Sequence, residues 1–335
     1  MLSIAECLVK ENEVDVFWDN PEILNEASIR FNLDLSKVKT VENIFSNKYS
    51  TLDRILKTFP YDKIIYLSDG SLPFILPGKL IVHFQQPIKK ENAPLSQRVK
   101  ILQASKVICN SLFTKSFIDK TYGIKSSLLY PPAQKVEQGN AVKKNIILTV
   151  GRFHPYTKGG DFKKLEFMIN AFKKINVDYK DWEFEIVTTV REQDEEIFKE
   201  RIESKVNKNI KITKNADYKT VSDSYRKAKI YWHAAGYEED TDKYPERAEH
   251  FGMSTVESMS AGCIPIVINL GGQREIVENN YNGFLWNDAD ELLTSTIKVI
   301  SDQTLSDLLS KNAVDTYKKF SKDKFCKTLK EIINP

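Results

Sequence analysis

Short runs rich in β-branched and aromatic residues alternate with longer amphipathic stretches along most of this chain. This alternation constrains the fold most, because strands that alternate with helices form α/β layers around a mainly parallel sheet. The first series of expected strands comprises residues 14–18, 63–68, 80–84 and 106–110. The second series comprises residues 145–150, 183–188, 210–213, 230–234 and 264–269. We expect one parallel sheet from each series, and helices over 163–176 and throughout the tail from 303 to 333.

A polar connection separates the two series. Residues 129–145 contain a Pro-Pro step followed by polar residues, a composition typical of linkers. The chain has 335 residues and 41% of them are apolar, which is enough for two domains. We therefore expect a Rossmann-like domain over 1–133, a linker over 134–144 and a second Rossmann-like domain over 145–315. Residues 316–335 are expected to form a helix that crosses back to the first domain, and the two domains are expected to face each other across a cleft.

The net charge of +3 is unevenly distributed. Residues 1–88 carry 9 Lys and Arg against 12 Asp and Glu, residues 89–144 carry 11 against 3, and residues 145–335 carry 29 against 31. Segment 89–144 is compatible with a solvated lysine-rich face or with a surface that meets phosphate-rich partners such as anionic lipid. It lacks the interleaved aromatic residues typical of single-strand binders, so no nucleic-acid partner is expected.

The cysteines and the N-terminus indicate a reducing compartment. Cys7, Cys109, Cys263 and Cys326 are far apart in sequence and have no metal-ligand spacing, so we expect reduced, buried thiols. The N-terminus has no basic leader, and no apolar run approaches the length of a membrane span. The sequence therefore predicts a cytoplasmic protein, with peripheral contact at the inner membrane face through residues 89–144.

Three loops carry the residues that point to chemistry. The strand at 145–150 runs into Gly151 and Arg152, and the following loop contains Gly159-Gly160 and Lys163. Glycines let a backbone approach a ligand, and cations at the carboxyl edge of a sheet can neutralise a diphosphate. Surface cations in a flexible loop are the alternative interpretation.

The second loop leads into a helix of small residues. Ser254 and Glu257 have the spacing of a capping box, which predicts Ser254 as the N-cap and gives Glu257 a structural interpretation. Gly252 lets backbone amides reach an anion at the positive end of that helix. Glu249 precedes the helix and is placed to accept hydrogen bonds from a sugar hydroxyl. The acidic pair Asp240 and Asp242 is not expected to bind a metal.

The third loop follows the strand at 264–269. Gly271-Gly272 forms a turn, and a helix is expected to start near Gln273 or Arg274, which gives a second helix start at the same edge. No G-x-G-x-x-G sequence follows an expected strand, which argues against a dinucleotide-dependent oxidoreductase.

In this order the three loops resemble the C-terminal domain of the family 4 retaining glycosyltransferases, which have the GT-B fold. The segment "EHFGMSTVESMSAGC" carries the family's Glu-x7-Glu pattern at Glu249 and Glu257, and residues 109–132 are similar to the segment that leads out of the acceptor domain. "EHFG" resembles in particular the mannosyltransferases of lipid-linked oligosaccharide synthesis. The chain begins within a helix similar to the one that follows the family's first strand, so the first domain is expected to lack that strand and its glycine-rich loop.

The resemblance implies a role for each matching residue. Arg152 and Lys163 correspond to the cations that bind the donor diphosphate, with Lys158 as the competing choice. Glu249 would hold hydroxyls of the donor sugar, and Glu257 those of the ribose. His83, after an expected strand, corresponds to a histidine near the reacting sugar, with a structural role as the alternative. The remaining donor-binding residues implied are Gly151, Phe251, Gly252, Met253, Ser254, Gly272 and Gln273.

The function implied is that of a metal-independent, retaining hexosyltransferase. It would move a hexose, with mannose favoured, from a nucleotide-diphospho-sugar to a glycan or a lipid-linked acceptor, with no cofactor beyond that co-substrate. A GDP-sugar is the favoured donor and a UDP-sugar the alternative. A GT-B protein that binds a nucleotide-sugar or a glycan without transferring it is the second hypothesis.

Overall fold

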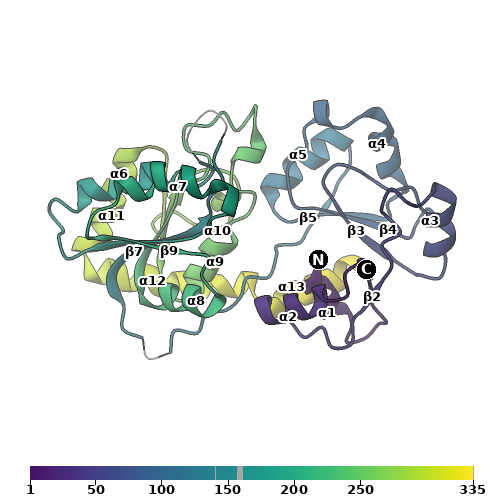
Figure 1. Ribbon diagram of the computed structural model, residues 1–335, viewed down its shortest axis with the longest axis horizontal. Coiled ribbons are helices and arrows are strands. Elements are labelled where there is room, and N and C mark those ends of the chain that lie inside the picture. Colours follow the sequence, from purple (N-terminus) through teal and green to yellow (C-terminus); the bar gives the residue numbers. More distant parts are fainter. Residues whose placement is uncertain (140, 157–160, 335) are drawn as a thin grey trace. The chain divides into compact units, whose positions relative to one another are not determined.

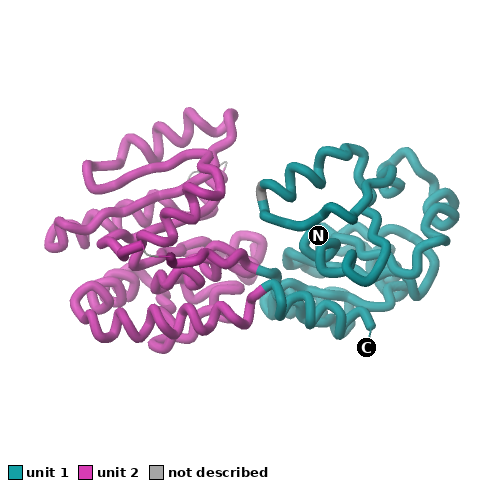
Figure 2. Tube along the Cα trace, turned by 90° about the horizontal axis from the view of Figure 1, so that it is seen from below, with its two compact units in different colours: residues 1–132, 322–335 teal, residues 133–321 magenta. Residues whose placement is uncertain are grey.

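The computed structural model describes residues 1–139, 141–156 and 161–334. Within it the chain divides into two compact units, drawn in different colours in Figure 2. Unit 1 contains Met1–Pro132 and Lys322–Pro335, and unit 2 contains Ala133–Ser321. Unit 1 thus takes its last helix from the far end of the chain.

Unit 1 is built from short strands and helices (Figure 1). Its elements are α1 (Leu2–Leu8), β1 (Asp15–Phe17), α2 (Ile23–Phe31), β2 (Lys39–Val41), α3 (Thr51–Thr58), β3 (Ile64–Ser68), β4 (Leu80–Phe84), η1 (Lys90–Asn92), α4 (Leu95–Lys100), η2 (Ile101–Gln103), β5 (Lys106–Cys109), α5 (Leu112–Tyr122), β6 (Ser127–Leu128) and α13 (Lys322–Ile333).

The strands of unit 1 form two sheets rather than the single sheet expected. β3, β4, β5 and β6 pair in that order, and all their pairings are parallel. β1 pairs with β2, a strand that the sequence did not predict, because its three residues leave too little pattern to detect. β4 is buried at every position, as expected of a central parallel strand covered on both faces.

The last helix packs on the first helix of unit 1. Cys7 on α1 and Cys326 on α13 form a disulfide with their Cα atoms 5.4 Å apart. This finding corrects the expectation of four reduced thiols, which relied on sequence separation; the separation is 319 residues, but the fold brings both helices together. Cys109 and Cys263 are free and buried, as expected. The pair lies in an apolar cluster with Ile81 and Leu329, so the joined helices cover one face of the four-stranded sheet.

Unit 2 has longer strands and a larger core. Its elements are β7 (Lys144–Arg152), α6 (Leu165–Ile175), β8 (Glu183–Thr189), η3 (Glu192–Asp194), α7 (Glu195–Arg201), η4 (Glu203–Lys205), β9 (Ile210–Lys214), α8 (Tyr218–Lys227), β10 (Ala228–His233), η5 (Pro245–Arg247), α9 (Met253–Ser260), β11 (Ile264–Ile268), α10 (Gln273–Ile276), β12 (Phe284–Trp286), α11 (Ala289–Ser301), α12 (Gln303–Tyr317) and η6 (Lys318–Phe320).

The sheet of unit 2 is parallel throughout, in the order β12-β11-β10-β7-β8-β9. The chain extends the sheet from β7 to β8 and β9 on one side, then continues with β10 on the other side of β7. The reversal places a topological switch point between β7 and β10, where open α/β sheets bind ligands. Figure 1 shows α6 and α11 on one face of the sheet and α8, α9 and α12 on the other.

The boundaries of unit 2 differ from the sequence expectations in two places. β12 was not predicted, since Phe284–Trp286 is a three-residue run at the end of a loop. The tail is not one helix: α12 ends at Tyr317, η6 follows, and α13 begins at Lys322, where the chain passes into unit 1. Among the described residues no helix combines the length and apolar character that a membrane span requires.

Candidate functional site

The candidate site lies at the carboxyl ends of three neighbouring strands of unit 2. β7 ends at Arg152, β10 at His233 and β11 at Ile268, and these strands are adjacent in the order β11-β10-β7. The loops after them contain Lys163, Glu249 and the Gly271-Gly272 turn. Parallel pairing therefore brings the three loops selected from the sequence to one edge of the sheet.

Glu249 is held by two side chains from neighbouring loops. The Lys163 Nζ donates a hydrogen bond to Glu249 Oε2 at 2.6 Å, and the His233 Nε2 lies 2.9 Å from the same oxygen. The Lys163 Nζ and the His233 Nε2 are 3.4 Å apart. The side chains of Lys163 and Glu249 are 14% and 20% exposed, so the pair is shielded but open on one side. Because both contacts use Oε2, the other carboxylate oxygen, Oε1, is left to accept hydrogen bonds from a ligand.

The protonation states of Glu249 and His233 follow from their burial and from the Lys163 charge. Burial disfavours the Glu249 carboxylate, but the Lys163 ammonium and the hydrogen bond from His233 outweigh that effect and hold the pKa of Glu249 well below its usual range. Burial, reinforced by the Lys163 charge, lowers the pKa of His233. At neutral pH, His233 is therefore neutral and donates through Nε2 to an ionised Glu249.

The loop before α6 positions Lys163. The buried carboxylate of Asp161 accepts hydrogen bonds from the backbone amides of Lys163 and Leu165, at 2.8 and 3.0 Å. The stem of Lys163 lies over Gly151, where an added Cβ would come within 2.8 Å of the Lys163 Cε. Lys158, Gly159 and Gly160, which the sequence analysis also selected, lie outside the described residues.

Arg152 ends β7 at the same edge. Its residue is exposed, and no described residue forms an ion pair or hydrogen bond with its guanidinium. A guanidinium that has no partner among the described residues suits a diphosphate, since Arg binds phosphate oxygens in a bidentate manner.

Glycines bring the loops after β10 and β11 into close contact. The Gly272 amide donates to the Glu249 carbonyl oxygen at 2.8 Å, and a Cβ on Gly272 would lie 2.4 Å from the Phe251 Cα. Gly252 has φ +121, and a Cβ there would meet the Gln273 Nε2 at 2.7 Å. Only glycine fits these positions, so the turn after β11 fixes the backbone that carries Glu249.

Helix α9 starts differently from the expectation. Its N-cap is Gly252, with no side-chain cap, so Ser254 and Glu257 do not form the predicted capping box. Ser254 instead hydrogen-bonds to the Tyr231 hydroxyl at 2.7 Å, and Glu257 Oε2 accepts from the Tyr225 hydroxyl at 3.2 Å. The sequence prediction failed because the left-handed glycine moved the helix start two residues toward the N-terminus. As a result the first amides of α9 have no side-chain acceptor and are available to an anion.

The remaining predicted donor residues surround this helix start. Met253 is 36% exposed. Phe251 is buried and contacts Phe320 edge to face, so only its backbone can face a ligand. Gln273 begins the single turn of α10 and is buried, and neither atom of its side-chain amide has a hydrogen-bond partner among the described residues. A buried amide with no partner is costly, which is consistent with a polar ligand or water at this position.

Glu257 is the second acidic residue of the pattern. Burial raises the pKa of its carboxyl to about 7, and the hydrogen bond from Tyr225 only partly opposes that effect. The two glutamates therefore differ in charge near neutral pH, since Glu249 is ionised and Glu257 is partly protonated.

His83 belongs to unit 1. It lies within β4, which matches the strand expected over 80–84, and so does not follow a strand as its comparison with the family implied; it is 4% exposed. Burial lowers the pKa of His83 to about 3, so the ring is neutral, and neither ring nitrogen has a hydrogen-bond partner among the described residues. The geometry described for unit 2 does not include this residue.

Metal-ligand clusters are absent from the described residues: no group of three or more His, Cys, Asp or Glu side chains has the required arrangement. In the acidic loop after β10, Asp240 accepts a hydrogen bond from the backbone amide of Lys243. Glu239 in the same loop forms ion pairs with Lys164 and Arg247, at 2.6 and 2.7 Å. These ion pairs attach the acidic loop to the segment that carries Lys163.

Sequence reasoning missed His233, Tyr231 and Tyr225. His233 and Tyr231 lie in β10, where every residue except Lys229 is buried. Because the burial is nearly continuous, it does not indicate which residue at the strand end faces a ligand. A polar residue next to the end of the strand predicted over 230–234 was the available signal for His233, because strand ends line this edge of the sheet.

Replacing Gly151 by alanine is expected to displace Lys163 without unfolding the unit. The backbone at Gly151 accommodates alanine, and the clashing atoms belong to the flexible end of a lysine. We expect about a tenfold lower kcat for the reaction carried out at this site with little change in Tm, because the Lys163–Glu249 contact is lost. Gly272→Ala is the contrasting variant, since its clash is with backbone and should lower Tm by several degrees. Unchanged kcat in Gly151→Ala would contradict the position assigned to Lys163.

Comparison with known proteins gives the class of protein that this fold and site define. Residues 132–316 match the model of the family described as "Glycosyl transferases group 1". This chain belongs to that family.

Two curated relatives are similar over about two thirds of the chain. An uncharacterized glycosyltransferase of Methanocaldococcus jannaschii is 28% identical over 227 residues, which cover 66% of this chain and 57% of the relative. The Dictyostelium discoideum GDP-Man:Man(3)GlcNAc(2)-PP-Dol alpha-1,2-mannosyltransferase is 22% identical over 244 residues, which cover 68% of this chain and 47% of that relative. The chain thus matches about half the length of these curated relatives.

Solved structures confirm the fold class. A glycosyltransferase from Rickettsia africae superimposes with a TM-score of 0.76 at 16% identity, covering 99% of this chain and 94% of that one. The Anabaena protein HepE, solved in complex with UDP and glucose, has a TM-score of 0.69 at 17% identity with the same coverage. The predicted α/β class and GT-B fold are therefore confirmed.

Proposed function

We propose that this protein is a retaining glycosyltransferase of family 4 that moves a hexose from a nucleotide-diphospho-sugar to a glycan or a lipid-linked acceptor. The observation that carries the proposal is the Glu249 carboxylate, which Lys163 and His233 hold through one oxygen while the other oxygen stays open. A carboxylate in that state can bind sugar hydroxyls in a fixed geometry.

The diphosphate would lie between the strand end of β7 and the start of α9. Arg152 and Lys163 would supply positive charge, and the uncapped amides after Gly252 would donate hydrogen bonds. Breaking the bond to the anomeric carbon places negative charge on the departing diphosphate. Groups fixed in advance around that charge stabilise the transition state more than the ground state, so they accelerate the step without a metal ion.

Retention of configuration would follow a front-face route in which the departing phosphate helps to deprotonate the acceptor hydroxyl. The single ionised carboxylate of the cluster, Glu249, is already engaged by Lys163 and His233, which supports a binding role rather than that of a nucleophile. A trapped glycosyl-enzyme adduct detected by mass spectrometry would contradict this route.

GDP-mannose is the donor we propose first. The Dictyostelium relative is named for a GDP-mannose reaction, and that name supports this choice at 22% identity. A UDP-sugar is the alternative, since HepE was solved with UDP and glucose. Glu257 would hold the ribose hydroxyls in either case. We further propose that the protein acts in the cytoplasm, in part at the membrane surface.

A thermal-shift screen of GDP- and UDP-hexoses, followed by turnover with the best ligand, tests the function. A donor present at about 100 times its Kd stabilises the fold by about 2.7 kcal/mol, which is readily measured. Transfer or slow hydrolysis of that donor supports the enzyme. Tight binding without either reaction would favour the nucleotide-sugar-binding hypothesis instead.

The donor affinity is expected to rise about tenfold between pH 6 and pH 8. With a pKa of about 7, Glu257 is mostly protonated at pH 6 and mostly ionised at pH 8, and only the ionised carboxylate accepts hydrogen bonds from both ribose hydroxyls. Calorimetry at each pH measures this change. Glu257→Gln should bind more weakly with no such pH dependence. If the donor affinity of this variant rose between pH 6 and pH 8 as much as that of the wild type, the role of Glu257 would be contradicted.

A further inference from the structure

Helix α3 of unit 1 presents a row of large apolar side chains to solvent. Leu52, Leu56 and Phe59 are 64%, 63% and 67% exposed. They are spaced four and three residues apart, so they lie on the same side of the helix. Single exposed apolar residues are ordinary on protein surfaces, but a row of this kind is not.

A second row of the same spacing lies on α4 and η2. Leu95, Val99 and Leu102 are 73%, 59% and 74% exposed. The opposite side of this segment is firmly attached to the unit, because Ile101 is buried and Gln97 Oε1 accepts a hydrogen bond from the Leu72 amide. The segment that carries Leu95, Val99 and Leu102 is therefore packed firmly against the rest of unit 1.

The loop between β3 and β4 connects the two rows. The Gly78 amide donates to the carbonyl oxygen of Gln103, the last residue of η2, at 3.3 Å. The next residue, Lys79, donates to the Phe59 carbonyl oxygen at 2.6 Å, and its ammonium lies 5.1 Å from the centre of the Phe59 ring. Phe74 in this loop is 46% exposed. We call this surface the apolar face; it comprises Leu52, Leu56, Phe59, Phe74, Leu95, Val99 and Leu102.

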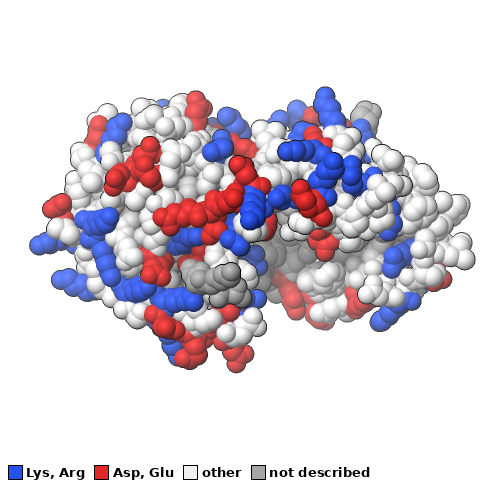
Figure 3. Space-filling view, turned by 90° about the horizontal axis from the view of Figure 1, so that it is seen from above, with Lys and Arg blue, Asp and Glu red and all other residues white. Residues whose placement is uncertain are grey.

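Cations surround the apolar face at α4. Residues 89–103 contain four Lys and Arg and one Glu. Lys90 is exposed, and Arg98 and Lys100 lie beside the row on α4. Figure 3 shows Lys and Arg side chains gathered over the part of unit 1 that carries α4 and α5.

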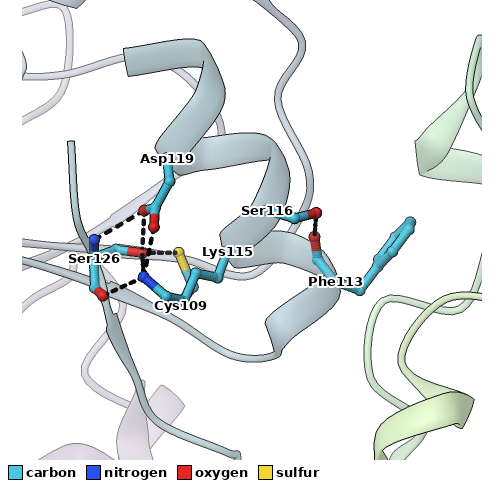
Figure 4. A network of polar contacts seen from close by, with 6 residues as sticks. All are labelled: Cys109, Phe113, Lys115, Ser116, Asp119 and Ser126. Carbon is cyan, nitrogen blue, oxygen red and sulfur yellow. Dashed lines mark hydrogen bonds and ion pairs between the residues drawn. The ribbon is translucent and has the colours of Figure 1, made fainter. Parts of the chain in front are cut away.

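Three other cations of segment 89–144 form ion pairs or hydrogen bonds within their own units. Figure 4 shows Lys115 on α5, which pairs with Asp119 and donates to the Ser126 carbonyl oxygen, both at 2.5 Å. Lys135 pairs with Glu137, and the Lys143 ammonium donates to two backbone carbonyl oxygens in unit 2. These three cations are therefore already engaged by groups of the chain itself.

We propose that the apolar face of unit 1 binds the surface of an anionic lipid bilayer. Aliphatic and phenylalanine side chains would enter the boundary between headgroups and acyl chains, while Lys79, Lys90, Arg98 and Lys100 meet the lipid phosphates. The excess of cations along residues 89–103, four Lys and Arg against one Glu, favours an anionic surface as the partner. The connection to a lipid-linked acceptor rests on the proposed function, but binding to the bilayer does not.

Co-sedimentation of the full chain with vesicles tests the proposal. Vesicles of phosphatidylglycerol and phosphatidylcholine in equal parts should bind the protein at least tenfold more tightly than vesicles of phosphatidylcholine alone. The triple variant Leu95→Ser, Val99→Ser and Leu102→Ser should lose at least tenfold of the affinity for the anionic vesicles. Lys90→Ala should weaken binding about fivefold, because Lys90 is exposed and forms no ion pair with a described residue.

The matched control replaces three exposed apolar residues of unit 2, as Val142→Ser, Val177→Ser and Leu308→Ser. It should bind vesicles as the wild type does. Circular dichroism of both triple variants should be unchanged, since all six side chains are exposed. Wild-type protein that does not bind, equal affinity for both vesicle types, or equal losses in the two triple variants would overturn the proposal.

Self-association is the competing use of this surface. A concentration-dependent dimer that disappears in the α4 variant, without a preference for anionic vesicles, would assign the apolar face to a second copy of the chain. Vesicle binding is measured without a donor, and donor binding to unit 2 is measured without vesicles. Failure of one proposal is therefore distinguishable from failure of the other.

Discussion

Replacing Glu249 by glutamine is expected to lower kcat/KM for glycosyl transfer by about three orders of magnitude. The substitution keeps the shape of the side chain but removes the charge that Lys163 and His233 hold in place at 2.6 and 2.9 Å. One of the two oxygens becomes an NH2 group, which either faces the Lys163 ammonium or replaces the acceptor offered to the sugar. Losing one fixed polar contact in an active site typically costs 10²- to 10³-fold, and here two functions are lost together.

Steady-state kinetics with a purified donor measure this effect. Glu246→Gln is the matched control, because Glu246 is an exposed carboxylate in the same loop. It should retain the activity of the wild type within about twofold. The Tm of Glu249→Gln should stay within a few degrees of the wild type. Wild-type turnover in this variant would remove Glu249 from the site.

Replacing Lys163 by methionine is expected to lower kcat by 10²- to 10³-fold and to change the pH dependence of the reaction. In the wild type the Lys163 ammonium is the main influence that keeps the pKa of Glu249 low against the effect of burial. Without it, burial dominates and the pKa of Glu249 rises. The residual kcat at saturating donor should therefore fall at higher pH than the kcat of the wild type, in which Glu249 remains ionised at neutral pH.

Two variants make this test specific. Lys163→Arg keeps the positive charge and should retain more activity than Lys163→Met, with a pH profile like that of the wild type. Lys158→Met examines the competing lysine of the same loop and should lower activity by less than about threefold. A larger loss in Lys158→Met than in Lys163→Met would transfer the diphosphate role to Lys158.

Parts of this site could be predicted from the sequence for clear physical reasons. Gly151, Glu249 and Gly272 lie in loops that follow strongly apolar runs, and the ends of such runs in a parallel sheet meet at one edge. The contact between Lys163 and Glu249 spans 86 residues, and no local pattern predicts which of two lysines in a loop reaches it. In the structure Lys163 contacts Glu249, and hydrogen bonds to Asp161 shape its loop, while Lys158 lies outside the described residues.

The failed predictions share a cause, since each depended on tertiary context. The capping box at Ser254 was a valid local pattern, but Gly252 adopts a left-handed conformation and starts the helix earlier. The role of His233 depends on Lys163 and Glu249, which come from other loops, so its position near the end of a strand did not reveal its partners. The disulfide between Cys7 and Cys326 could not be deduced because it joins the two ends of the chain through helix packing.

The central claim is that a nucleotide-sugar binds in unit 2 between the Lys163–Glu249 pair and the start of α9. Hydrogen–deuterium exchange of the full chain, with and without a saturating donor, tests this most directly. We expect bound donor to slow exchange at the amides of residues 252–256 and 271–274, and this protection should be weaker in Lys163→Met. A bound donor that protects other segments and leaves these amides unchanged would contradict the claim.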